Sequence, residues 1–391
     1  MDRFTDQAPF FTDDHRRLAA SAASFVWREI EPHAARAEEA TDEDFRSLVA
    51  LLAEADLLRF CVRRDAPLDV RSLCIVREEL AYSSALADAA FVMQGLGTYA
   101  VSLAAPAHVR EFWIERAAAG RAVAAFALTE ADAGSDVSAV STTARLEGDA
   151  YVLDGRKRLI SNAGVADFYT VFARTGTRAD GRAELSAFVV SARMPGFSVR
   201  ERTQLIGAHP IGEIEFNNLR VPAEDRVGDE GDGHPLAMRT MYVFRPSVGA
   251  AACGMARRAL DEAIAHAKRR RQFGAPISSF QLVQAKLAEM ATELDAARLL
   301  VYRAAYARDA AERGEATADS SALTRAASEA KLYATEAAQR IIDEAVQIHG
   351  GAGLVRGAVV ERLYRDIRAL RIYEGTSEIQ KLIIARELLK E

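Results

Sequence analysis

Cysteine, histidine and lysine are all scarce in this chain of 391 residues. The three cysteines, Cys61, Cys74 and Cys253, are widely spaced and form no C-x-x-C pair. This argues against a disulfide framework or a zinc knuckle and indicates a reducing cytoplasm. The seven histidines are scattered without metal-ligand spacing, so no metal site is expected. Only six of the 50 basic residues are lysine, which we interpret as compositional bias.

Long apolar runs and a strong charge imbalance are also missing. No window approaches the ~18 apolar residues of a membrane span, and the first residues resemble neither a secretory signal nor a transit peptide. The net charge of −6 disfavours nucleic acid or an anionic membrane as the main partner. There is no G-x-S-x-G motif and no P-loop. With 50% hydrophobic and 27% charged residues, the chain predicts a globular protein of two or three domains.

The periodicity of the apolar residues changes twice along the chain. Residues 12–120 show helical spacing, interrupted at Gly95 and Gly97, and residues 123–232 hold short alternating segments joined by tight turns. From Gly233 onward the spacing is helical again and predicts a four-helix-type bundle. We therefore expect an α+β multidomain fold. Its parts are an N-terminal all-helical domain (1–122), a middle antiparallel, barrel-like β domain (123–232) and a C-terminal helical bundle (233–391).

Two polar segments could bind a ligand. In the loop 125–140, Thr129, Gly134 and Ser135 combine hydroxyls with an open backbone, which suits a phosphate or a polar ring edge, although an ordinary turn has the same composition. In the segment 269–281, three arginines precede a Gly and a Pro that break the helix. They suit a pyrophosphate clamp or a solvated helix end.

Two later segments sit at helix breaks. The glycines of the segment 347–354 follow a helical pattern, which excludes a Rossmann motif but would end a helix and let a cofactor approach the backbone. In the segment 371–380, Gly375 is expected to end one helix and Ser377 to cap the next, with Gln380 completing a capping box. Glu374 lies in this break against apolar neighbours. Its raised pKa would suit a general base, and the alternative is a surface glutamate.

These four segments, in this order, resemble the acyl-CoA dehydrogenase family. The resemblance runs through "LTEADAGSD", "FNNLRVPAEDRVGDEGDG", "RRRQFGAPISSFQ" and "QIHGGAG" to "IYEGTSEIQKLIIARELL". It implies the same order of helical, β and helical domains and an FAD held without a Rossmann fold. It also implies oxidation of an acyl-CoA thioester to the trans-2-enoyl-CoA, in which a carboxylate removes the α-proton and the flavin accepts the β-hydride.

The resemblance also assigns roles residue by residue. Glu374 matches the catalytic base, and the alternative position on the first helix of the bundle is excluded because residues 238–258 contain no Asp or Glu. The cofactor-binding residues it implies are Phe126, Leu128, Thr129, Gly134, Ser135, Leu159, Ile160, Ser161, Arg270, Phe273, Gln281, Gln347, Gly350, Gly351, Thr376, Ser377 and Glu378. The substrate-binding residues it implies are Ser135, Tyr242, Arg245 and Gly375.

The family also implies the partners of this chain. Arg270 and Gln281 would reach the FAD of a neighbouring subunit, so at least a dimer and by family habit a tetramer is expected. An electron-transfer flavoprotein is the expected electron acceptor. The segment 88–101 should lie near the acyl cavity. It contains no arginine, which disfavours a glutaryl-type substrate and leaves a short, branched or cyclic acyl group.

Several positions depart from the family pattern. Leu159 replaces a tryptophan, Ser161 a threonine and Tyr242 an aspartate, and "GAHPIGEIEF" replaces a polar Arg-x-Ser-x-Thr stretch. These changes leave the base and most of the flavin site in place but alter the expected contacts with CoA. Two alternatives therefore stay open: a dehydrogenase of acyl groups tethered to a carrier protein, and a catalytically silent flavoprotein relative.

Overall fold

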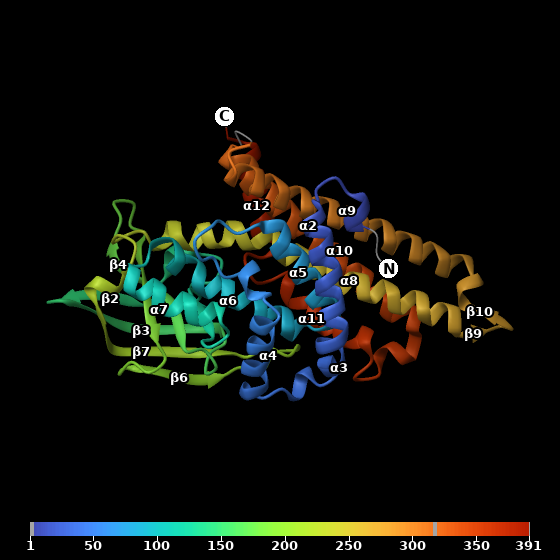
Figure 1. Cartoon of the computed structure of the whole chain (residues 1–391), viewed down its shortest axis with the longest axis horizontal. Helices are drawn as coiled ribbons and strands as arrows, with labels where there is room; N and C mark the ends of the chain where they lie inside the picture. The colour runs from blue at the N-terminus through green and yellow to red at the C-terminus, as the bar shows by residue number, and fades with distance from the viewer. Residues whose placement is uncertain (1–3, 316–318, 391) are drawn as a thin grey trace.

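The N-terminal part of the computed structural model is helical, as predicted. The structure describes residues 4–315 and 319–390. The helices are α1 (Phe4–Gln7), α2 (Asp13–Phe25), α3 (Glu31–Ala34), α4 (Asp42–Glu54), α5 (Val70–Ser83), α6 (Ala85–Ala104) and α7 (Ala107–Ala118), with short turns η1 (Val26–Ile30), η2 (Ala37–Glu39) and η3 (Leu58–Phe60). They form the blue and cyan part of Figure 1.

The expected interruption at Gly95 and Gly97 is wrong, because both glycines lie inside α6. They are small for packing reasons. A Cβ at Gly95 would lie 2.6 Å from the ring of Phe244, and one at Gly97 would lie 2.8 Å from the amide nitrogen of Ala125. The carbonyl of Gly97 also accepts a hydrogen bond of 2.6 Å from Thr170 Oγ1. The two glycines thus let α6 approach both the β domain and the bundle closely.

The middle part is a single eight-stranded sheet with the order β6-β7-β3-β2-β4-β5-β8, and β1 pairs with β4. Its strands are β1 (Ala124–Ala127), β2 (Thr143–Glu147), β3 (Ala150–Ser161), β4 (Phe168–Thr177), β5 (Ala183–Ser191), β6 (Phe197–Arg202), β7 (Ile211–Pro222) and β8 (Arg226–Val227), with turns η4 (Val137–Ala139) and η5 (Ala223–Asp225). The predicted pattern of short strands joined by tight turns is seen in β2 and β3, which pair antiparallel. The sheet is mainly antiparallel, but β1 and β2 each pair in parallel with β4, which the prediction missed.

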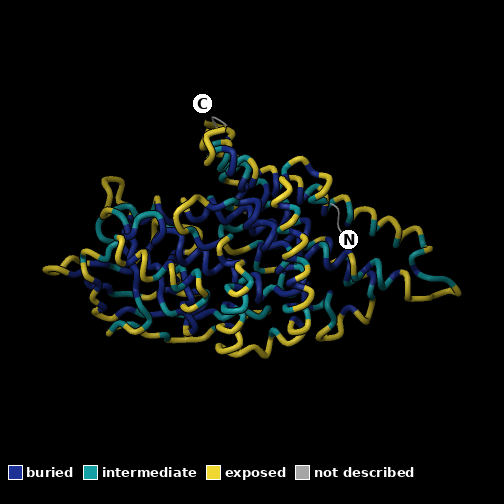
Figure 2. Tube along the Cα trace, viewed as in Figure 1, coloured by how far each residue is buried: buried dark blue, intermediate teal, exposed yellow. Residues whose placement is uncertain are grey.

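The C-terminal part is the predicted bundle. It contains α8 (Gly233–Arg269), α9 (Gln281–Glu312), α10 (Ser320–His349), α11 (Val359–Leu370) and α12 (Ser377–Leu388), with β9 (Arg271–Gln272), β10 (Ala275–Pro276), η6 (Ile277–Ser279) and η7 (Gly350–Leu354). The molecule is elongated, with the β sheet at one end and the β9–β10 hairpin at the other (Figure 1). The buried backbone runs through the middle, and both ends are exposed (Figure 2). No helix of the described residues is long and apolar enough to cross a membrane.

The crossing of α5 and α8 depends on Gly254. A Cβ there would lie 2.1 Å from the carbonyl oxygen of Glu78 and 3.1 Å from the amide nitrogen of Tyr82. Since both are backbone atoms, Gly254→Ala is expected to lower the free energy of unfolding by about 1–3 kcal/mol. Chemical denaturation of the FAD-loaded protein measures this change. Ser21→Ala, at an exposed position on α2 away from the proposed FAD site, is the control. An unchanged midpoint for Gly254→Ala would contradict the close crossing.

Candidate active site

The turn that carries Glu374 lies between α11 and α12. The preceding helix ends at Leu370, five residues before the predicted stop at Gly375. The predicted cap is also one residue off, because Thr376 is the N-cap of α12 and its hydroxyl accepts from Ile379 N at 3.3 Å. The hydroxyl of Ser377 instead donates to the carboxylate of Glu336, a stronger acceptor than a backbone group.

The backbone of this turn is strained and held in place. Glu374 has φ of +53°, which is uncommon for a residue with a side chain. Its carbonyl accepts from Arg245 Nε at 3.3 Å and from Gln380 Nε2 at 3.2 Å. The next carbonyl, of Gly375, accepts from Lys331 Nζ at 2.7 Å and again from Gln380 at 3.0 Å. Side chains from α8, α10 and α12 therefore fix the position of the Glu374 side chain.

The carboxylate of Glu374 is buried and has a free oxygen. Its Oε2 has no hydrogen-bond partner within residues 4–315 and 319–390. Burial raises its pKa, as expected from the sequence, while the positive charges of Arg77, Lys331 and Arg245 partly oppose this rise. The charge of Asp88 adds to it. An unpaired carboxylate oxygen with a raised pKa is the arrangement that a general base requires.

Arg77 and Lys331 are functional candidates that the sequence prediction missed. Arg77 binds Asp88 through two hydrogen bonds of 2.7 and 2.6 Å and donates to Ser247 Oγ at 2.9 Å. Its guanidinium therefore stays near Glu374 without bonding to it. Lys331 is fully buried, as is Lys157. The scarcity of lysine, with six in the chain, is the sequence signal that could have drawn attention to these two, whereas their burial is visible in the structure alone.

The loop 125–140 and the end of β3 are joined by hydrogen bonds. Arg158 N donates to the carbonyl of Thr129 at 2.9 Å, and Lys157 Nζ donates to the carbonyl of Leu128 at 3.0 Å. Lys157 also pairs with Glu130 at 2.8 Å, which lowers the pKa of that carboxyl to about 2. The structure thus brings together two segments, around Thr129 and Leu159, that the resemblance assigned to the flavin.

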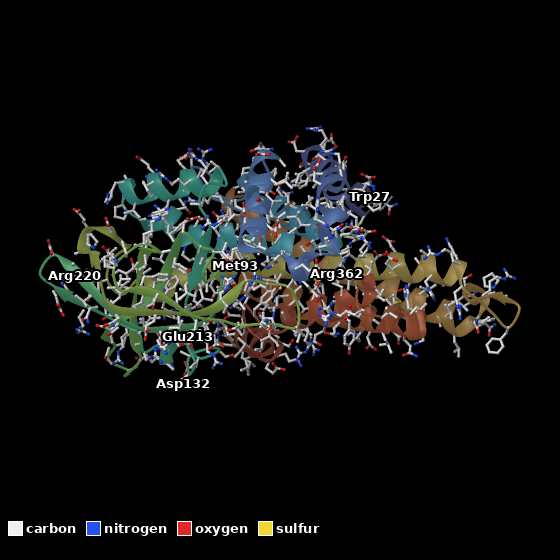
Figure 3. All side chains as sticks on the ribbon, turned by 90° about the horizontal axis from the view of Figure 1, so that it is seen from below. Trp27, Met93, Asp132, Glu213, Arg220 and Arg362 are labelled. Atoms are coloured by element: carbon white, nitrogen blue, oxygen red, sulfur yellow. The ribbon has the colours of Figure 1, made fainter. Side chains whose placement is uncertain are left out.

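The side chains of these segments differ in what they offer. Leu159 is 47% exposed and has φ of +54° at an irregularity of β3. The side chain of Ile160 is buried in the core, so only the backbone of Ile160 could contact a ligand. Gly134 and Ser135 are exposed, and a Cβ at Gly134 would meet nothing within 4 Å. Asp132, in the same loop, lies at the outer edge of the molecule (Figure 3). Met93, which belongs to α6, lies inside it.

A third group of predicted residues lies far from this loop. Arg270 directly precedes the β9–β10 hairpin, and Phe273 lies in its turn. This hairpin is at the opposite end of the molecule from the sheet (Figure 1). Phe273 is 97% exposed, and Gln281 is exposed at the start of α9. Exposed Gln347, Gly350 and Gly351 end α10, and the contact of His349 with His266 (4.2 Å between ring centroids) joins them to the end of α8. One chain alone does not bring this group to the loop.

Three of the four predicted substrate residues, Tyr242, Arg245 and Gly375, lie near Glu374. The guanidinium of Arg245 lies 5.5 Å from the centre of the Tyr242 ring, and Arg245 is buried with its Nε committed to the Glu374 carbonyl. Gly375 is part of the same turn, whereas Ser135 lies in the loop of the β domain. Arg245 therefore holds the turn of Glu374, a role that the resemblance did not assign to it.

The residues present fit a flavin. The loop offers open backbone at Gly134 and the hydroxyl of Thr129, and the end of β3 adds the hydroxyl of Ser161 and the exposed apolar side chain of Leu159. A planar ring system with a polar edge needs this combination of an apolar face and a few hydrogen-bonding groups. The open backbone at Gly350 and Gly351, where an added Cβ would meet nothing within 4 Å, leaves room for an extended group.

Comparisons with known proteins agree with this arrangement. Family models for the N-terminal, middle and C-terminal domains of acyl-CoA dehydrogenases match residues 12–121, 125–219 and 231–389. A 3-(aryl)acrylate reductase of Clostridium sporogenes is 38% identical over 389 residues, covering 97% of this chain and 100% of the relative. A cyclohexane-1-carbonyl-CoA dehydrogenase of Geobacter metallireducens is 34% identical over 388 residues, covering 98% and 99%.

A solved structure extends the likeness to the whole fold. The structure of a glutaryl-CoA dehydrogenase from Mycobacterium smegmatis in complex with FADH2 has a TM-score of 0.88 and 26% identity, covering 99% of this chain and 97% of that one. The three matching domain models and the two relatives of 38% and 34% identity lead to the same assignment. The chain belongs to the acyl-CoA dehydrogenase family, whose members are FAD-binding oxidoreductases acting on CH–CH bonds.

Proposed function

We propose that this chain dehydrogenates an acyl-CoA thioester to the trans-2-enoyl-CoA, with Glu374 as the base that removes the α-proton. The observation that carries this proposal is the buried, unbonded Oε2 of Glu374, held on a turn that three helices fix. FAD, when bound, supplies the acceptor for the β-hydride. The three cations around Glu374 favour its ionised form, which is the form that accepts a proton.

We propose that two copies of the chain complete each FAD site. One copy would contribute Phe126, Leu128, Thr129, Gly134, Ser135, Leu159, Ile160 and Ser161, with Thr376, Ser377 and Glu378 nearby. The other would contribute Arg270, Phe273, Gln281, Gln347, Gly350 and Gly351. The support for this division is that the β domain, which carries most of the first set, and the β9–β10 hairpin, which holds Phe273, lie at opposite ends of the molecule (Figure 1). A dimer is then the smallest active unit, and a tetramer stays a prediction.

The acyl group is proposed to be compact, such as a short, branched, cyclic or aryl-bearing one. The names of the reductase of 3-(aryl)acrylates and the cyclohexane-1-carbonyl-CoA dehydrogenase support this choice. Segment 88–101 contains no arginine, but Arg77 on α5 packs against it and brings a positive charge to this segment. Since Asp88 neutralises Arg77, a free dicarboxylate tail still finds no unpaired cation there.

The surroundings of the reaction are proposed on family grounds. An electron-transfer flavoprotein would reoxidise the flavin, and fatty acid or related acyl-CoA metabolism in the cytoplasm is the expected setting. The three cysteines of the described chain are buried and unpaired, which suits a reducing compartment.

An anaerobic titration tests the proposal. The purified, FAD-loaded protein is mixed with butyryl-, isobutyryl-, cyclohexanecarbonyl-, 3-phenylpropionyl-, palmitoyl- and glutaryl-CoA, and the visible spectrum is recorded. We expect bleaching by one or more of the compact thioesters and none by glutaryl- or palmitoyl-CoA. Bleaching only by the corresponding carrier-protein thioesters would favour the first alternative. A yellow protein that neither set bleaches would contradict the proposed activity, and a protein that cannot hold FAD would contradict the site.

Lys331→Met is expected to move the acidic limb of the kcat/KM profile to higher pH. Glu374 must be ionised to take the proton, so activity falls as the pH falls through its pKa. Lys331 helps to hold this pKa down, so removing its charge raises the pKa and shifts the limb upward. Burial lowers the pKa of Lys331 itself to about 8, so the shift should be largest below that pH. Lys286→Met, at the surface pair with Glu344, is the control; an unshifted limb in Lys331→Met would contradict this role.

A further inference from the structure

The hydroxyl of Ser161 has a histidine partner in a half-buried position. Ser161 is the last residue of β3, and its Oγ lies 2.7 Å from Nε2 of His209. His209 belongs to the connection between β6 and β7, in the stretch where the sequence departs from the family's polar pattern. In this stretch, the imidazole of His209 therefore supplies a polar contact to Ser161.

The connection that carries His209 is anchored on both sides. Within the sheet, Asn162 N donates to the carbonyl of Pro210 at 2.7 Å, and Thr203 N donates to that of Ile211 at 2.9 Å. From the bundle, Arg365 on α11 donates to the carbonyl of Ile206 at 3.0 Å. The imidazole is therefore placed by the sheet and by the helix that leads to Glu374, and it has a defined position relative to Ser161.

The number of protons on the pair limits what Ser161 can do. Burial lowers the pKa of His209 to about 4, so at neutral pH the ring is uncharged and carries one N–H. If Nε2 accepts, the single hydrogen of the Ser161 hydroxyl is used up inside the protein. If Nε2 carries the hydrogen, it donates to Oγ and leaves the hydroxyl hydrogen free for a ligand. Donation to Oγ also strengthens that hydroxyl as a donor.

We propose that His209, protonated on Nε2, is a positioning residue that holds the Ser161 hydroxyl as a donor toward the bound flavin. This inference rests on the proposed function, because it takes Ser161 as the residue that meets the flavin. It assigns to His209 no contact with the substrate and no proton transfer. The effect is on direction: without the imidazole, the hydroxyl of Ser161 can turn to other acceptors, and the hydrogen bond to the flavin is lost for part of the time.

Four variants of the FAD-loaded protein test this role: His209→Phe, His209→Gln, Ser161→Ala and the double variant His209→Phe/Ser161→Ala. Phenylalanine keeps the ring without a donor, whereas the glutamine amide can place an N–H close to the position of Nε2. The readouts are the visible absorption bands of the flavin, the Kd for FAD, and the rate constant of anaerobic bleaching by the thioester that the wild-type protein accepts. Thermal denaturation monitors the fold.

We expect His209→Phe and Ser161→Ala to shift the flavin bands in the same way. Each should slow bleaching by about three- to tenfold, the range expected for loss of one hydrogen bond. The double variant should be no slower than either single variant, and His209→Gln should recover most of the wild-type rate and spectrum. Wild-type bands, Kd and rate in His209→Phe would overturn the inference. Additive effects in the double variant would also overturn it, since they are typical of a separate packing role. A wild-type protein that binds no FAD would refute the proposed function instead.

Discussion

Glu374→Gln is expected to reduce kcat for the accepted thioester by about 10²- to 10⁴-fold, the usual contribution of a general base. Glutamine has nearly the same shape as glutamate and keeps the turn, but its amide cannot accept the α-proton. The neighbouring Glu378 cannot replace it, because its side chain is exposed and its pKa is lowered by hydrogen bonds. Steady-state kinetics with an artificial electron acceptor measures the loss.

The control for this variant is Glu111→Gln, at an exposed position on α7. Both proteins should retain FAD and unfold at similar temperatures. If Glu374→Gln were folded, FAD-loaded and as active as Glu111→Gln, Glu374 would not be the base. The run 238–258, which holds no carboxylate, offers no other base at the alternative family position.

Arg77→Met is expected to lower the free energy of unfolding by about 3–5 kcal/mol, the cost of leaving a buried charge unpaired. The exposed fractions of Arg77 and Asp88 are 1% and 3%, and the two side chains form two parallel hydrogen bonds. Removing the guanidinium leaves the Asp88 carboxylate in the interior without its partner, and it also removes the bond that Arg77 donates to Ser247 Oγ. Denaturant titration of the FAD-loaded protein gives the loss directly.

The double variant Arg77→Met/Asp88→Leu separates the pair from its surroundings. Because no charge is then left unpaired, this protein should be clearly more stable than Arg77→Met alone. The surface pair Arg64–Glu115 provides a comparison, since Arg64→Met should change stability by no more than about 1 kcal/mol. Equal losses for the Arg64 and Arg77 variants would contradict the burial argument.

The domain order could be predicted from periodicity, because helices and strands place apolar residues at different spacings. In α11, for example, the residues spaced three and four apart are buried: Val360, Leu363, Ile367 and Leu370. One error comes from small residues. Glycines such as Gly95 and Gly97 are typical of helix breaks, yet here they permit close packing inside α6, and sequence alone does not distinguish the two uses. The domain boundaries at residues 122 and 232 stay predictions.

Glu374 could be singled out as a candidate base from the sequence, but the side chains around it could not. The segment 371–380 carries its own signals in a short stretch, and the ordered motifs pointed to the family. Arg77, Lys331 and Arg245 reach Glu374 from three different helices, so no local pattern connects them. The contact of His209 with Ser161 joins residues 48 positions apart and depends on the register of β3 and β7.

The most direct test of the account is α-hydrogen exchange on a thioester that cannot be dehydrogenated. 3,3-Dimethylbutanoyl-CoA has α-hydrogens but no hydrogen on its β-carbon, so proton removal is separated from hydride transfer. It is incubated with the FAD-loaded protein in D2O, and the recovered thioester is analysed by mass spectrometry, with binding measured separately. We expect deuterium at the α-carbon with the wild-type protein and with Glu111→Gln, and none above background with Glu374→Gln. Equal incorporation with Glu374→Gln, or no incorporation by a wild-type protein that binds the thioester, would contradict this expectation.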